Sequence, residues 1–120
     1  MPRSPSTFPR AMAVAACCVL ALPLAARAQM AVPETFVRPD KGHCIACHQL
    51  PEGLGRQNRA DVGPRLEGAR MRALDRAKLK ATLEDPTAAN PDTVMPPFGR
   101  HRILQPAEIE ALVEFLHALP

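Results

Sequence analysis

The chain has 120 residues, of which 47% are hydrophobic and only four are aromatic, all of them Phe. Its formal charge of +3 is accounted for by Arg3, Arg10 and Arg27, since from residue 29 onward twelve Lys or Arg face twelve Asp or Glu. This balance argues against a basic surface that binds nucleic acid. The shortage of aromatic residues leaves the chain with little hydrophobic core of its own.

The first 28 residues have the pattern of a signal peptide. Arg3 and Arg10 lie in a positive N-terminal region, residues 11–26 form an apolar run, and Ala26-Arg27-Ala28 matches the small-x-small pattern of a cleavage site. The apolar run is shorter than the roughly 20 residues that a membrane-spanning helix needs. We therefore expect secretion to the periplasm and no membrane span in the mature protein.

Cleavage at that site would make Gln29 the first mature residue. We expect residues 29–41 to be a lead-in segment, because Pro33 and Pro39 leave little room for a long helix there. Residues 42–120 would then form a single domain. A lipoprotein cleavage site before Cys17 is the less favoured alternative.

Residues 44–48 read Cys-Ile-Ala-Cys-His, and this spacing is typical of covalent haem c attachment. Cys44 and Cys47 would form thioether bonds with the porphyrin, while His48 would bind the iron as proximal ligand. We expect a short helix over residues 44–48 to present these side chains. One covalently bound haem would also supply the apolar body that this aromatic-poor chain lacks.

Two other kinds of site use similar residues. A thiol–disulfide oxidoreductase would use Cys44 and Cys47 as a redox pair, but that motif normally follows a strand in a βαβ unit, and no strand is predicted before it. A zinc site would need about four ligands, and Cys44, Cys47 and His48 leave one missing. Both alternatives are therefore less favoured than haem.

The loop over residues 53–68 contains Gly63-Pro64-Arg65-Leu66. A histidine that binds metal needs a partner for its other ring nitrogen, and we expect the rigid carbonyl of Pro64 to accept that hydrogen bond from His48. Leu66 would pack against the haem. The plainer interpretation of the segment is a turn followed by a buried leucine.

The next helix is predicted to begin after Asp75, whose carboxylate can cap it, and to end by Asp85 because Pro86 follows. Leu74 and Leu79 stand at the two positions of a hydrophobic staple around this start. The helix is therefore expected to bury one apolar face.

The long loop over residues 86–104 contains the favoured sixth ligand of the iron, Met95. Two prolines follow Met95 directly and would restrict the mobility of its thioether. Met71 is a further candidate but is better explained as a surface or gap-filling residue, and His43 is too close to Cys44 to reach the other haem face. His101 remains an alternative ligand, because a bis-histidine iron is chemically reasonable.

The last helix is predicted to start at Pro106 and to extend almost to the C-terminus. Ile109, Leu112, Val113 and Leu116 recur at helical spacing and form one apolar stripe. No segment alternates in the way that a strand would, so the predicted fold is all-α, with few helices and long loops around one haem. Arg65, Arg100 and Arg102 are candidate partners of the haem propionates.

Four segments together, CIACH, VGPRL, TVMPPFG and the closing ILQPAEIEALVEFL, resemble the class I c-type cytochromes. The GHCIACH and NPDTVMPPFG stretches are similar to the SoxX family, the monohaem subunits of the SoxAX complex. The resemblance extends over most of residues 42–119. It implies thioethers at Cys44 and Cys47 and axial ligation by His48 and Met95.

The resemblance also implies a function. A SoxX protein would accept electrons from SoxA-linked thiosulfate oxidation, with a SoxA-like cytochrome as partner and a cytochrome or oxidase as acceptor. The complex would act as an L-cysteine S-thiosulfotransferase, and this subunit would not be catalytic alone. The alternative is a free-standing periplasmic cytochrome c that carries electrons between respiratory or photosynthetic complexes.

Overall fold

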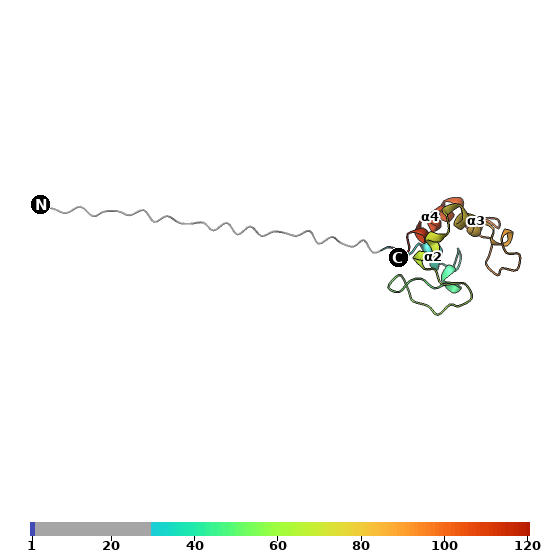
Figure 1. The fold of residues 1–120 in the computed structure, drawn as a ribbon, viewed down its shortest axis with the longest axis horizontal. Coiled ribbons are helices and arrows are strands. Elements are labelled where there is room, and N and C mark those ends of the chain that lie inside the picture. Colours follow the sequence, from blue (N-terminus) through green and yellow to red (C-terminus); the bar gives the residue numbers. More distant parts are fainter. Residues whose placement is uncertain (2–29) are drawn as a thin grey trace.

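The computed structural model describes Met1 and residues 30–120. The predicted signal peptide, its cleavage site before Gln29 and the lipoprotein alternative at Cys17 lie outside the described residues. The elements follow in the order α1 (Glu34–Val37), the 3₁₀ helix η1 (Cys44–Ala46), α2 (Gly68–Ala73), α3 (Arg76–Glu84), the 3₁₀ helix η2 (Pro86–Ala88) and α4 (Pro106–His117) (Figure 1). No strand occurs in residues 30–120, and the predicted all-α fold is confirmed.

The helix α4 is the centre of the hydrophobic core. It contacts α1, α2 and α3, and Figure 1 shows it beside α3. The predicted stripe of Ile109, Leu112, Val113 and Leu116 is buried, as expected. At its N-terminus the carboxylate of Glu108 accepts a hydrogen bond of 2.8 Å from the backbone N–H of Gln105, which satisfies one of the free donors of the first turn.

The helix α3 begins where the sequence predicted. The Asp75 carboxylate accepts a hydrogen bond of 2.6 Å from the backbone N–H of Lys78, and the helix ends at Glu84, two residues before Pro86. Leu79 and Leu83 are buried against the core. The cap, the apolar spacing and the proline together account for this element.

Within residues 30–41 the lead-in segment has one helix, the single turn α1, and no long helix forms there, as Pro33 and Pro39 predicted. Its Phe36 is 1% exposed and meets Phe115 of α4 edge to face, with ring centroids 5.8 Å apart. A salt bridge of 2.8 Å between Lys41 and Glu108 joins the same two regions. One aromatic contact and one salt bridge therefore attach this short segment to α4.

The helix α2 was not predicted from the sequence. It lies where a loop up to residue 68 and a basic stretch were expected, and no side chain caps its N-terminus. Tertiary contacts hold it: Gly68 N–H donates to the Pro120 carbonyl at 2.9 Å, and the Arg72 guanidinium donates to the Leu119 carbonyl at 2.5 Å. Met71 is only 4% exposed, so the prediction of a surface position was wrong and that of a gap-filling position was right.

The structure differs from the prediction at two further short segments. The helical turn predicted over residues 44–48 is the 3₁₀ helix η1, which ends at Ala46, and η2 forms one turn inside the long loop over residues 86–104. Within residues 30–120, none of the helices has the length and apolar character needed to cross a membrane.

Candidate haem site

One apolar cavity of about 500 Å³ lies at the centre of the domain. Its wall brings together segments that are far apart in the sequence: η1 and the loop that follows it, α2, α3, the segment before Phe98 and the buried face of α4. The predicted site residues Cys44, Cys47, His48, Pro64, Leu66 and Met95 all line this cavity. The structure therefore collects in one place the residues that the sequence singled out separately.

The His48 ring is held by a backbone carbonyl of the same cavity wall. Its Nδ1 lies 2.8 Å from the Pro64 carbonyl oxygen. A carbonyl can only accept, so Nδ1 carries the proton and donates it, and Nε2 keeps a lone pair that can bind a metal ion. The ring also lies directly against Gly63, where an added Cβ would come within 2.4 Å of His48 Cε1. A glycine at this position thus makes room for the imidazole.

Cys44 and Cys47 are both partly buried and form no disulfide with each other. Burial raises the pKa of the Cys44 thiol to about 11, and the neighbouring Cys47 adds to the rise. Such a thiol stays protonated at neutral pH and is a poor ligand for a metal ion. Among residues 30–120, no three His, Cys, Asp or Glu side chains are arranged to hold a metal ion.

Two thioethers face the same cavity, those of Met95 and Met71. Met95 lies in the loop over residues 86–104, and its backbone N–H donates a hydrogen bond of 3.2 Å to the Thr93 hydroxyl. The other candidates for the sixth ligand differ in place. His43 lines the cavity next to Cys44, whereas His101 is exposed and is not part of the cavity wall.

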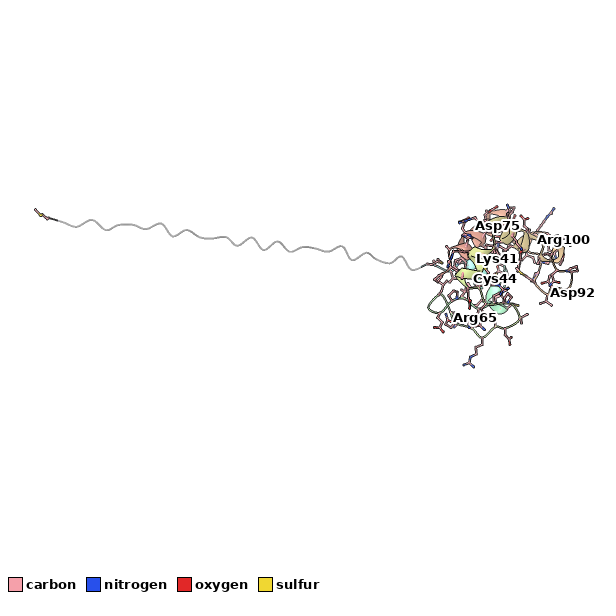
Figure 2. The ribbon with its side chains drawn as sticks, viewed as in Figure 1. Lys41, Cys44, Arg65, Asp75, Asp92 and Arg100 are labelled. Carbon is pink, nitrogen blue, oxygen red and sulfur yellow. The ribbon has the colours of Figure 1, made fainter. Side chains whose placement is uncertain are left out.

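None of the arginines proposed as propionate partners reaches the cavity. Arg65 is exposed and pairs with Glu67, and Arg100 pairs with Asp85. Figure 2 shows Arg65 and Arg100 at separate edges of the domain, with Cys44 between them. Among residues 30–120, the arginine on the cavity wall is Arg70 of α2, which was not predicted as a site residue because the helix itself was not predicted. Its position in a basic stretch was the only available signal.

The residues present fit a covalently attached haem. The cavity is largely apolar, its wall carries the two thiols of a CxxCH motif, and an oriented imidazole nitrogen and thioether sulfurs are available as ligands for low-spin iron. Gly63 leaves the space that the His48 ring fills. The ligand atoms, the orientation of the imidazole and the shape of the cavity therefore all suit a haem.

The family comparison points the same way. A family model described as cytochrome C oxidase, cbb3-type, subunit III matches residues 31–116, while neither the curated proteins nor the solved structures contained a match. The predicted class I cytochrome c domain is confirmed, but the match does not single out the SoxX family. The chain belongs to the family described as cytochrome C oxidase, cbb3-type, subunit III, and is an electron-transfer c-type cytochrome with covalently bound haem c.

Proposed function

We propose that this cytochrome carries one haem, attached at Cys44 and Cys47 and ligated by His48 and Met95, and that it serves as the SoxX-type subunit of a periplasmic SoxAX complex. The convergence of these four residues on one cavity is the observation that carries the haem assignment. Haem bound there supplies one-electron chemistry, as its iron alternates between the ferric and ferrous states.

The chain's own residues would set the properties of the site. Pro64 keeps the proton on Nδ1 of His48 and so leaves Nε2 to the iron. Leu79, Leu83 and Leu112 keep water from the inner end of the cavity. An apolar environment and a thioether ligand would both favour ferrous over ferric haem, because the ferrous iron–porphyrin unit carries no net charge. The proposed function therefore includes a raised reduction potential.

The rim of the cavity offers a contact surface for a partner. Val94 and Val62 both line the cavity and yet are 79% and 62% exposed. Apolar side chains with that much exposure at the rim would gain from being covered by a partner, and a partner bound there would bring its redox centre close to the cavity. Arg70, also on the wall, adds a positive charge.

The SoxX assignment rests on the similarity of the GHCIACH and NPDTVMPPFG stretches, which contribute the proposed proximal and distal walls. A tagged mature chain should recover a SoxA-like cytochrome from periplasm. Recovery of no second cytochrome, together with rapid reduction of a terminal oxidase by the purified protein, would instead favour the free-standing carrier.

The haem and its ligands can be tested by spectroscopy. A pyridine haemochrome of c type is expected, with one haem per chain, and the oxidised protein should show the weak sulfur-to-iron band at the red edge of the spectrum. Met95→Ala should abolish that band. Met71→Leu is the matched control, since Met71 has the same functional group in the same cavity, and it should keep the band. A band lost in the control alone would assign the ligand to Met71.

The rim can be tested with a second matched pair. Val94→Asn should slow electron transfer with the partner severalfold while leaving the reduction potential nearly unchanged, because it makes the rim polar without adding a charge. Val37→Asn is the control, because Val37 is 39% exposed and does not line the cavity. Equal slowing by both variants would argue against the proposed contact surface.

A further inference from the structure

The turn that carries the CxxCH motif has few partners of its own. The 3₁₀ helix η1 is only three residues long, and the carbonyls in and after it accept hydrogen bonds from residues outside the turn. Residues 58–66 supply those partners. Gly63 N–H donates to the Cys47 carbonyl at 2.8 Å, and Leu66 N–H donates to the Gln49 carbonyl at 2.9 Å. The neighbouring segment thus acts as the missing continuation of the turn.

A single side chain completes this set. The amide nitrogen of Asn58 donates to the carbonyl of Ile45 and, at 3.0 Å, to the carbonyl of His48. A primary amide has two N–H groups, and both are used here, one on each side of Cys47. Asn58 is half-buried, as are Ile45 and His48, so loss of the amide would leave two carbonyls with restricted access to water.

We propose that Asn58 is a positioning residue for the proximal ligand. By holding the carbonyls of Ile45 and His48, it fixes the turn at the orientation in which the His48 imidazole meets the Pro64 carbonyl. This inference rests on the proposed role of His48. Asn58 does not line the cavity and acts only through the turn.

The adjacent residue offers a matched control. Gln57 has the same functional group on the same loop, but it is exposed and its amide is directed to the carbonyls of Pro51 and Leu54, at 3.3 and 3.5 Å. Those contacts lie outside the CxxCH turn. A general effect of changing a side-chain amide in this loop would therefore appear at both positions, whereas a positioning effect would appear at Asn58 alone.

The test uses the mature holoprotein and two pairs of variants. Asn58→Asp keeps the shape of the side chain, removes both N–H donors and places a carboxylate next to two carbonyl oxygens, which it repels. Asn58→Leu removes the donors without adding charge. Gln57→Glu and Gln57→Leu repeat the two changes at the control position. The readouts are the hydrogen-exchange rate of the His48 Nδ1–H in the ferrous protein, measured by NMR, and the reduction potential.

Loss of one to two hydrogen bonds should accelerate exchange of the His48 Nδ1–H about threefold to tenfold in Asn58→Leu, and more in Asn58→Asp, with a shifted potential in both. The Gln57 variants should stay within about twofold of the wild type, a change too small for a lost hydrogen bond. Exchange in Asn58→Leu at the wild-type rate would overturn the proposal, as would equal acceleration by the Gln57 variants.

A third variant guards against a failure to mature. Asn58→Gln keeps the amide on a longer side chain and should give mature protein with exchange between the wild-type and Leu rates; exchange as fast as in the Leu variant would overturn the proposal. The proposed function is judged separately. A wild-type protein without a c-type haemochrome would refute the haem assignment, whereas a normal haemochrome with unaltered exchange in the Asn58 variants would refute the positioning role alone.

Discussion

The contact between Gly63 and the His48 ring yields the sharpest mutational prediction. A Cβ at residue 63 would lie 2.4 Å from Cε1, 2.7 Å from Nδ1 and 2.8 Å from Nε2 of His48, whereas ordinary contact begins at 3.4 Å. In Gly63→Ala the ring must therefore retreat by about 1 Å. A shift of that size would break the hydrogen bond of 2.8 Å to the Pro64 carbonyl.

The expected cost has two parts. Overpacking of this kind costs about 1–3 kcal/mol, and the lost hydrogen bond adds about 1 kcal/mol. The free energy of unfolding of the holoprotein, measured with guanidinium chloride, should therefore fall by about 2–4 kcal/mol. Because the displaced ring is the proposed iron ligand, the hyperfine-shifted proton resonances of His48 and the reduction potential should change as well.

Gly53→Ala is the control. Gly53 has φ +80° and no atom within 4 Å of an added Cβ, so alanine there should cost about 1–2 kcal/mol through backbone strain alone. Its potential and its His48 resonances should match the wild type. If Gly63→Ala were no less stable than Gly53→Ala and kept the wild-type resonances, the ring would not occupy the space that the structure gives it.

Three further predictions concern other parts of the domain. The Gln105 N–H and the Lys41 ammonium lower the pKa of Glu108 below its ordinary 4.5. The stability that the ionised Glu108 contributes is therefore complete above about pH 4.5 and is lost as the pH falls through the lower pKa of the folded state. In Glu108→Gln, the free energy of unfolding should fall less steeply with decreasing pH in this range. Phe36→Leu should cost about 1–2 kcal/mol in the same assay through its lost contact with Phe115, and wild-type stability would contradict it. His43, at φ 45°, should tolerate glycine with a melting temperature at or above wild type; a clear loss would count against backbone strain there.

The sequence by itself determined the parts of the protein that depend on local patterns. The CxxCH spacing, the apolar stripe from Ile109 to Leu116 and the cap at Asp75 each lie within a dozen residues. Such patterns reflect helix periodicity and the chemistry of neighbouring groups, which distant contacts do not alter. The all-α fold, α3 and α4 followed from them.

Other features depend on contacts between distant segments, and only the tertiary structure decided these. The N-terminus of helix α2 has no side-chain cap, and the carbonyls of Leu119 and Pro120, about fifty residues away, hold the helix in place. No local pattern therefore predicted it. Met71 and Arg70 lie on the cavity wall because they belong to this helix.

The arrangement around the CxxCH turn was likewise beyond the sequence. The sequence suggested Pro64 as a partner of His48, but the space at Gly63 and the two hydrogen bonds from Asn58 depend on how a loop folds back over η1. Loops fold according to the partners they meet rather than by periodicity. The sequence therefore determined which chemistry this protein carries, and the tertiary structure decided which residues orient it, because orientation arises from contacts that no local pattern encodes.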